Sequence, residues 1–320
     1  MSTMKKVVIS AIVFLACSLL CTEAGAEKRI GILIFSEEVR YIAATKGFTE
    51  VLKETGFGEP RTKIIIENGG ANKAKVAELV QKFAAAKMDL IFSVGTHAST
   101  AICQEIKDVP IVFSVVYDPV AAGIAKNWKS SGNNTTGTST QMPLSKLIEA
   151  MKQFAPVKKL AVLYSPGEKN SETQLKDLQG LQATYGIKVL PAPMTKNEEV
   201  AHLLPVITPS TDALFVSGSN LVDSQVAAIV EGATKAKVLT ISHLEDLIEK
   251  GVLLGVCPNC YLIGRLAGEK AVKILKGAKP SSIPIESLKQ FDLIINLKTA
   301  RAGGFRVPPE MMKTARTIEK

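Results

Sequence analysis

One nine-residue pattern occurs twice in this chain, and the repetition strongly limits the folds open to it. Residues 89–97 read DLIFSVGTH and residues 212–220 read DALFVSGSN. Each begins with an acidic residue, continues with an apolar run and ends with glycine and small polar side chains. Such a run predicts a buried parallel strand that leads into a functional loop. One copy would fit any α/β protein, whereas two copies indicate a duplication.

The segments around the two copies repeat as well. Residues 28–36 match residues 158–165, because each has a basic pair, an apolar strand and a serine. A further pair follows downstream, at 109–117 and 237–243. We therefore predict two copies of one βαβαβ unit. A chain of 320 residues that is 46% hydrophobic is long enough to form two cores.

The first 26 residues predict a removable signal peptide. Lys5-Lys6 precede an uncharged apolar run at 7–20, and Ala24-Gly25-Ala26 offers small residues for cleavage after Ala26. The run is short for a transmembrane span. Lipoprotein anchoring is the alternative, because Leu15-Ala16-Cys17 would suit lipid attachment, but Cys17 lies inside the apolar run. Cleavage and export to the periplasm are favoured.

Charge and motifs argue against several classes of function. The formal charge is +9, but the lysines are scattered and aromatic residues make up only 5% of the chain, which favours a solvated surface over a nucleic-acid interface. GxGxxG after the first strand, phosphate-loop, Gly-x-Ser-x-Gly and His-Glu-x-x-His motifs are absent from the sequence. The sequence therefore predicts no enzyme, cofactor or metal. A His97–His243 acid–base or metal pair across a cleft is the disfavoured alternative.

Three cysteines lie beyond the predicted signal peptide. Cys257-Pro258-Asn259-Cys260 is close enough in sequence to close a disulfide in an oxidising compartment, with Cys103 as a buried thiol. Two inert thiols, or a redox or metal function, are the alternatives. A structural disulfide between Cys257 and Cys260 is the favoured interpretation.

Local patterns predict the order of elements. Helices are expected at 42–54, 72–87, 98–106, 144–154 and 261–275, and strands at 111–116, 251–256 and 291–296. Gly264 and Gly268 are expected to allow close packing of the helix at 261–275. The small polar stretch 132–139 is interpreted as a crossover between the halves. The tail after the second copy indicates that the chain crosses back, so several crossovers form a hinge.

The carboxyl ends of parallel strands predict where a ligand binds. The first half places Ser36, Glu37, Tyr41, Gly95, Thr96, His97, Tyr117 and Asp118 there, and the second half places Ser165, Glu168, Asn170, Ser171, Ser217, Asn220, Ser242 and His243. Helix N-termini after Gly95 and Gly218 would suit a carboxylate. The tyrosines could cover an apolar group, and Glu37, Glu168 and Asp118 could hold an ammonium. Each residue taken alone is better explained as an ordinary cap or loop position, so the prediction rests on their coincidence at one end of every strand.

The chain resembles the solute-binding proteins of ABC importers. Within these it is similar to the type I two-lobed group and to its tryptophan/tyrosine-type or uncharacterised branch. The segments that carry the resemblance are Lys46-Gly47-Phe48, 89–96, 110–113, Asp118-Pro119, 134–137, Tyr164 with 167–171, and 296–300. The match covers roughly the whole chain after residue 26.

The resemblance implies an α/β fold of two Rossmann-like lobes with parallel sheets, joined by a multi-strand hinge. It implies lobes of 27–140 plus 258–288 and of 141–257 plus 289–320, which close on a small ligand. The positions that correspond to ligand or cleft residues are Thr96, Asp118, Glu168, Asn170 and Ser171.

Two departures from the family pattern make an aromatic amino-acid ligand questionable. Ser217-Gly218-Ser219-Asn220 lacks the aspartate that many relatives place before the asparagine, so an ammonium contact is missing. Cys257 and Cys260 stand where relatives often have an aromatic pair.

The sequence thus predicts an exported, monomeric, non-enzymatic receptor for a small amino-acid-like or carboxylate solute. Its expected partner is an inner-membrane ABC permease with its ATPase. The alternative is a periplasmic sensory protein that reports ligand occupancy to a membrane kinase or chemoreceptor, and a hydrolase or redox enzyme is the third choice.

Overall fold

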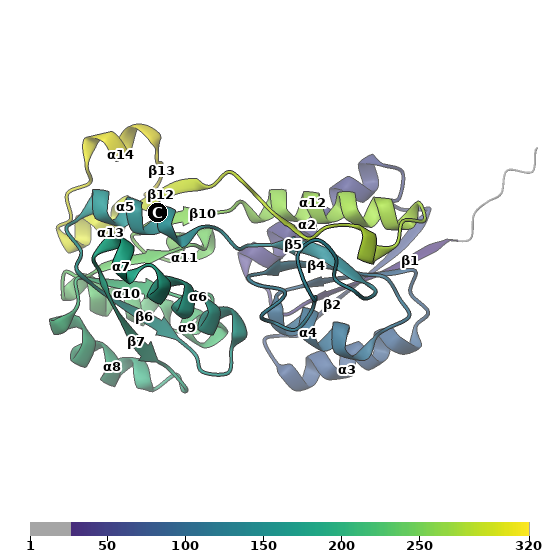
Figure 1. Cartoon of the computed structure of the whole chain (residues 1–320), viewed down its shortest axis with the longest axis horizontal. Helices are drawn as coiled ribbons and strands as arrows, with labels where there is room; N and C mark the ends of the chain where they lie inside the picture. Colours follow the sequence, from purple (N-terminus) through teal and green to yellow (C-terminus); the bar gives the residue numbers. More distant parts are fainter. Residues whose placement is uncertain (1–26, 320) are drawn as a thin grey trace, which may run out of the picture.

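The computed structural model describes residues 27–319, so the signal peptide predicted over 1–26 lies outside the described residues. These residues form two α/β lobes side by side (Figure 1). One sheet has the strand order β11-β5-β4-β3-β1-β2, and the other has the order β13-β12-β10-β9-β8-β6-β7. The prediction of two Rossmann-like lobes with mainly parallel sheets is confirmed.

The first lobe combines early residues with a late segment. Its strands are β1 (Lys28–Ile34), β2 (Thr62–Asn68), β3 (Leu90–Val94), β4 (Ile111–Val116), β5 (Thr135–Ser139) and β11 (Glu286–Ser287). Its helices are α2 (Val39–Glu54), α3 (Lys73–Ala85), α4 (Thr96–Glu105) and α12 (Cys260–Leu275), with a 3₁₀ turn at Pro280–Ser282. The pairs within this sheet are parallel.

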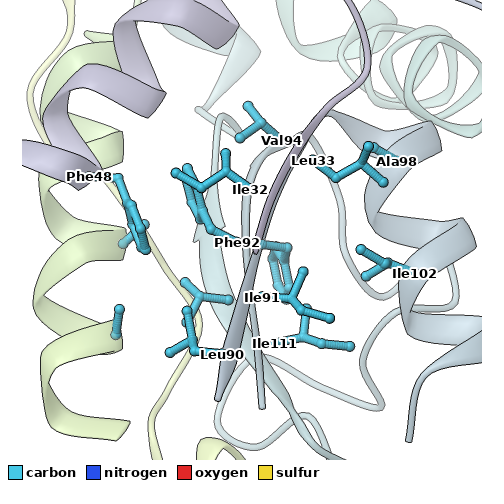
Figure 2. Close-up of a cluster of buried hydrophobic side chains, with 14 of the residues drawn as sticks. Ile32, Leu33, Phe48, Leu90, Ile91, Phe92, Val94, Ala98, Ile102 and Ile111 are labelled. Carbon is cyan, nitrogen blue, oxygen red and sulfur yellow. The ribbon is translucent and has the colours of Figure 1, made fainter. Parts of the chain in front are cut away.

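Helices cover both faces of the first sheet, which explains why its central strands β3 and β4 are apolar except for one serine each. Figure 2 shows Phe48 of α2 on one side of the strands, and Ala98 and Ile102 of α4 on the other. The ring of Phe48 stacks on Phe92 of β3 with centroids 3.8 Å apart. Leu33 of β1 points to the α4 side (Figure 2). The strand that the repeat predicted is therefore a central core strand.

Helix α12 packs closely on α2 because glycine stands at the contact. A Cβ atom at Gly264 would lie 2.0 Å from the carbonyl oxygen of Ala44, which no larger residue could tolerate without a shift. At Gly268 a Cβ atom would lie 3.0 Å from the carbonyl oxygen of Phe48. The predicted role of these two glycines is confirmed.

The second lobe contains the second copy and the end of the chain. Its strands are β6 (Lys159–Tyr164), β7 (Lys188–Pro193), β8 (Ala213–Val216), β9 (Leu239–Ser242), β10 (Leu254–Cys257), β12 (Asp292–Asn296) and β13 (Arg316–Ile318). Its helices are α5 (Leu144–Phe154), α6 (Lys169–Gly180), α7 (Gln182–Tyr185), α8 (Glu199–Ile207), α9 (Asn220–Ser224), α10 (Val226–Lys235), α11 (Glu245–Glu249), α13 (Leu297–Gly303) and α14 (Pro309–Thr314), with a 3₁₀ turn at Thr208–Ser210. Strand β12 runs antiparallel to β10.

The interpretation of 132–139 as a mere crossover is wrong, because β5 lies within it as a fully buried strand. Its threonine hydroxyls find partners inside the lobe. Thr136 Oγ1 donates to the carbonyl of Ile283 at 2.8 Å, and Thr138 Oγ1 lies 3.0 Å from Ser114 Oγ. Threonine is β-branched and suits a strand once its hydroxyl is satisfied. A polar segment can therefore form an inner strand here.

Within the described residues the chain passes between the lobes at three places, which form the hinge (Figure 1). The crossings lie between β5 and α5, between β10 and α12, and between β11 and β12. The second crossing consists of Pro258 and Asn259 alone. The side chain of Asn259 accepts from the Leu262 amide and caps α12, which therefore begins one residue before the predicted start.

The disulfide expected between Cys257 and Cys260 is not formed: both are buried free thiols. The two side chains belong to different cores. Cys257 belongs to a buried cluster of the second lobe, whereas Cys260 belongs to the buried cluster of the first lobe. Burial raises the pKa of the Cys260 thiol to about 12 and also raises that of Cys257, so both thiols stay protonated at neutral pH.

No helix between residues 27 and 319 is long and apolar enough to cross a membrane.

Candidate functional site: a cleft between the lobes

An inner cavity lies between the two lobes, next to the carboxyl ends of strands from both sheets. Its volume is about 20 Å³. Residues that line it include Arg40, Tyr41, Thr96, Tyr117, Asn170 and His243. All of these except Arg40 were predicted as cleft residues from the strand-end rule. The two halves of the repeat therefore supply opposite walls of one small cavity.

A larger pocket adjoins it, which we call the outer pocket. It measures about 280 Å³, and its lining includes Lys73, His97 and Thr100 of the first lobe with Gly167 and Lys169 of the second. Thr96 borders both the inner cavity and the outer pocket. Closure of the lobes therefore completes the outer pocket.

The first turn of α4 faces both spaces. Gly95 precedes the helix with φ of 93°, a conformation that glycine adopts readily, and a Cβ atom there would lie 3.0 Å from the ring of Tyr41. Among the described side chains none caps this helix. The first amide groups of a helix have no intrahelical acceptor and carry a partial positive charge. Together with Lys73, this helix end is suited to a carboxylate, whereas Lys169 already pairs with Glu172 at 3.0 Å.

A hydrogen-bonded chain of side chains crosses the cleft. Glu168 accepts from the backbone amide of Asn220 at 2.9 Å and from its Nδ2 at 3.3 Å. The same Nδ2 lies 3.2 Å from Nδ1 of His97 in the other lobe. Burial lowers the pKa of His97, although Glu168 opposes this, so a neutral imidazole accepts from the amide. Glu168 therefore holds Asn220 in the position from which it contacts His97 of the first lobe.

A buried charge cluster joins the lobes on another side of the cleft. Arg40 of α2 contacts Glu38 and Asp223 at 2.9 Å each, and it also contacts Asp246. Lys250 contacts Asp223 as well. Burial alone would lower the pKa of Arg40, but Asp246 and the other carboxylates raise it well above its usual value. Arg40 therefore stays charged and clamps the second lobe.

Sequence reasoning missed the Arg40 cluster. Arg40 lies in the first turn of an amphipathic helix, two residues after a glutamate. This local pattern predicts a solvent-exposed side chain. Its partners lie 183 and 206 residues further along the chain. Only the approach of the two lobes brings these charges together, so no local signal in the sequence could have found them.

Tyr117 lines the inner cavity and connects the two lobes. Its hydroxyl donates to Asp177 of α6 at 2.9 Å, and its ring lies edge-on to His243 with centroids 5.3 Å apart. Burial raises the pKa of Tyr117, and Asp177 raises it further, so the hydroxyl remains a donor. Although Tyr117 follows β4 of the first lobe, its ring packs in the core of the second.

His243 lines the inner cavity and is 1% exposed. Its ring stacks on Phe215 with centroids 5.9 Å apart. Burial, with Arg40 nearby, lowers the pKa of His243 to about 3, so the imidazole is neutral at physiological pH. Its Nδ1 finds no hydrogen-bond partner among residues 27–319.

The other predicted residues lie near the cleft but are engaged elsewhere or buried. Ser165 bonds to Ser219 at 2.7 Å, Ser171 donates to the carbonyl of Ser165, and Ser242 donates to that of Val216. Glu37 accepts from Asn68, and Asp118 accepts from the amides of Val120 and Ala121. Ser36 and Ser217 have buried hydroxyls without a partner in the described chain. These side chains shape the loops, and none of them is among the residues that line the inner cavity or the outer pocket.

His97 and His243 occupy different surroundings, since His97 stacks on Phe35 and His243 on Phe215. In the part of the chain that the structure describes, no group of three or more His, Cys, Asp or Glu side chains is arranged to hold a metal ion.

Comparison with known proteins assigns the family. A model of the family described as ABC transporter substrate binding protein matches residues 29–319. A tyrosine-binding protein of Clostridioides difficile (strain R20291) is 29% identical over 283 residues, which covers 88% of this chain and 82% of that protein.

Two solved structures are similar over 92% of this chain. The domain from Streptococcus pneumonia in complex with L-Trp has a TM-score of 0.86 and 28% identity, with all of its chain covered. The ligand-free, open structure of a substrate binding protein with adhesive properties from Clostridium difficile has a TM-score of 0.75 and 32% identity, with 99% covered. The overall shape is thus more similar to the tryptophan complex, although the open structure is closer in sequence.

These relatives are substrate-binding proteins, and they confirm the type I two-lobed fold that the sequence predicted. The chain belongs to the ABC transporter substrate binding protein family.

Proposed function

We propose that this protein is the extracytoplasmic receptor of an ABC importer and traps a small amino-acid-like or carboxylate ligand between lobes 27–140 plus 258–288 and 141–257 plus 289–320. The observation that carries the proposal is the pair of spaces around Thr96, since both lobes line each of them. A site divided between two lobes binds ligand and closes in one step. The ligand is then delivered to an inner-membrane permease with its ATPase.

The chemistry of the outer pocket supports a ligand with a carboxylate. The uncapped first turn of α4 contributes partial positive charge and Lys73 contributes a full positive charge, whereas Lys169 lines the pocket but pairs with Glu172 at 3.0 Å. Val76, Ala101 and Ala122 supply apolar contact. Its volume of about 280 Å³ is near the lower end for small-molecule sites. The named ligands of the relatives, tyrosine and tryptophan, make aromatic amino acids the first candidates.

Closure supports the transport role. The Arg40 cluster, the contact between Asn220 and His97 and the bond from Tyr117 to Asp177 all join the lobes. A ligand that contacts both lobes would favour this closed arrangement by its differential affinity, which gives a permease a surface to recognise. We propose a periplasmic monomer for this role.

Native mass spectrometry of protein purified from the periplasm without refolding tests the proposal. We expect a stoichiometric adduct of amino-acid mass, or, for bare protein, a thermal shift with L-tyrosine or L-tryptophan. The protein with its amino acid should also stimulate ATP hydrolysis by the permease and ATPase in proteoliposomes. Binding without stimulation would contradict the transport role and favour a sensory one. Failure to bind any amino acid would contradict the ligand class.

A further inference from the structure

Strand β2 forms an open edge of the first sheet. It is the last strand in the order β11-β5-β4-β3-β1-β2, and within residues 27–319 it pairs with β1 alone. It has seven residues, and the side chain of Ile66 in it is 54% exposed. A long edge strand with exposed apolar side chains presents unpaired backbone groups to solvent and can pair with a further strand.

The hydrogen bonds at the two ends of β2 show which of its backbone groups face outward. The carbonyl of Arg61 accepts from the Lys28 amide at 3.2 Å, and the Gly69 amide donates to the carbonyl of Ile34 at 2.9 Å. Positions 61 and 69 therefore point to β1. The register with β1 is continuous, and backbone groups alternate in direction along a strand. The amides and carbonyls of positions 62, 64, 66 and 68 therefore point away from the sheet.

The other sheet edges in the described part of the chain are short or blocked. Strands β11 and β13 have two and three residues. Strand β7 has six residues, but it contains Pro191 and Pro193. The Lys188 and Met194 amides donate toward β6, so positions 189, 191 and 193 point outward. The prolines therefore remove two of the three outward donors, which protects this edge against pairing.

Strand β7 is the copy of β2 in the internal repeat, so the two edges can be compared position by position. Pro191 pairs with Val162 of β6, and Ile66 pairs with Ile32 of β1. Val162 and Ile32 occupy the same place in the repeated segments 158–165 and 28–36. Ile66 therefore stands where the second lobe has a proline, and the first lobe lacks that protection.

The sequence of β2 is complementary to itself when two copies run antiparallel. The run Lys63-Ile64-Ile65-Ile66-Glu67 has opposite charges at equal distances from its centre. With a twofold axis at Ile65, Lys63 of each copy faces Glu67 of the other. Ile64 then faces Ile66, and these outward positions form the hydrogen-bonded pairs. Opposite charges and β-branched side chains at directly opposite positions both stabilise a pair of strands.

The side chains at these positions are available to a partner. Lys63 is exposed and has no hydrogen bond or ion pair with any described residue. Glu67 contacts Lys82 of α3 through Oε1 at 2.6 Å, which leaves Oε2 for a second cation. Ile66 lies on the same face as Ile32, which points to the α2 side of the sheet (Figure 2). The apolar and the charged contacts would thus lie on opposite faces of the paired strands.

We propose that β2 is a self-association surface, through which two copies of this chain pair antiparallel about Ile65 and join their first sheets into one. A single pair of seven-residue strands makes a small interface, so the dimer is weak and forms at high protein concentration. The transport role proposed above needs one copy. The pairing is therefore a separate property that goes beyond the proposed function, and either can fail alone.

Sedimentation equilibrium of the protein purified from the periplasm, from micromolar to roughly millimolar concentration, tests the pairing. We expect the mass to rise from that of one chain toward that of two. Ile66→Lys places a charge opposite Ile64, and Ile66→Pro removes an outward donor but no bond to β1. Either should weaken the association by at least about tenfold, because both symmetric halves of the interface are affected. Val206→Lys, at an exposed apolar position of α8, is the matched control that should leave it unchanged.

Charge exchange tests the register. Lys63→Glu alone, or Glu67→Lys alone, places like charges opposite each other at both ends of the paired strands, so each variant should remain a single chain. In an equimolar mixture of the two variants, position 63 of each copy again faces an opposite charge at position 67 of the other. Mixed dimers should therefore form at the concentrations at which the unmodified protein forms its own.

A single-chain mass for the unmodified protein at every concentration would overturn the proposal. A dimer that persists in the Ile66 variants would show that the copies associate elsewhere and would overturn β2 as the surface. Failure of the mixture to dimerise would overturn the pairing about Ile65. If Ile66→Pro does not fold by its melting curve, Ile66→Lys and the charge variants decide.

Discussion

The guanidinium of Arg40 lies 2.9 Å from the carboxylate of Asp223, although 183 residues separate them and each side chain is 4% exposed. The contact joins the start of α2 in the first lobe to α9 in the second. Water would reach both groups if the lobes moved apart. The ion pair therefore belongs to the closed arrangement and not to either lobe alone.

Arg40→Met should open the cleft. The substitution leaves Asp246 buried without its cation and leaves Asp223 with Lys250 alone. A buried carboxylate without a cation costs about 3–5 kcal/mol unless water reaches it. Opening hydrates both carboxylates, so we expect a larger radius of gyration in small-angle X-ray scattering. The exposed Arg61→Met is the control, and adding Asp246→Asn should restore part of the closure. An unchanged radius of gyration together with unchanged stability would contradict the clamp.

Acid should destabilise the protein through His243. Its folded pKa of about 3 lies below the ordinary value of 6.5, so between these values the unfolded state binds more protons. The stabilisation is complete above pH 6.5 and is lost as the pH falls toward 3. In urea titrations at several pH values, His243→Phe should flatten this slope, whereas His202→Gln should not. An equal slope in both variants would show that His243 is not the titrating group.

Glu168→Ala should weaken amino-acid binding by more than about tenfold without unfolding the protein. Glu168 holds the backbone amide and Nδ2 of Asn220, which in turn reaches His97 across the cleft. Isothermal titration and the melting temperature of the ligand-free protein check the two parts of the prediction. Glu199→Ala on α8 is the matched control. Unchanged affinity would remove Glu168 from the site.

Cys257 and Cys260 should be unreactive in the folded protein. Because burial raises the pKa of Cys260 to about 12, only about one thiol in 10⁴ is ionised near pH 8. We expect no alkylation by iodoacetamide at neutral pH, and labelling of both residues in urea. An intact mass two hydrogens below the reduced value, measured without reductant, would instead establish the disulfide.

Gly264→Ala should destabilise the first lobe by about 1–3 kcal/mol, because the new methyl group meets the carbonyl of Ala44. Gly180→Ala at the end of α6 is the matched substitution, since, apart from its chain neighbours and the adjacent backbone of α6, no described atom lies within 4 Å of its Cβ position. There the change should be neutral or stabilising by up to about 1 kcal/mol. Urea unfolding of the two variants gives the comparison, and equal stabilities would contradict the close packing of α12 on α2.

The fold could be predicted because its rules are local and repetitive. The apolar run 89–94 and its copy at 212–217 each form an inner strand, one in each of the two sheets. The strand-end rule found Thr96, Tyr117 and Asn170 at the inner cavity. The strand β5 was missed because its threonine side chains look like loop residues until their buried partners are known. The alternation of polar and apolar residues does not show that a threonine hydroxyl has a hydrogen-bond partner inside the fold.

The site was less predictable because its chemistry depends on pairing between distant segments. Glu168 looked like a free carboxylate, yet Asn220 occupies it. Cys257 and Cys260 looked like a disulfide pair, yet each side chain packs into a different core. In both cases the sequence correctly singled out residues near the cleft. The hydrogen-bond or packing partner of each side chain depends on how the lobes fold and meet, which the sequence pattern does not show.

The two-residue connection between β10 and α12 has a mechanical consequence. Helix α12 has 16 residues, which makes it about 24 Å long, and its start is tied to the other lobe through Pro258 and Asn259. A rotation of about 5° in that connection moves the far end of the helix by roughly 2 Å. Pro258 fixes its own φ angle, so α12 can rotate relative to the second lobe about only a few backbone bonds of this connection. A small change at the ligand is thus amplified into a directed displacement on the outer surface of the molecule.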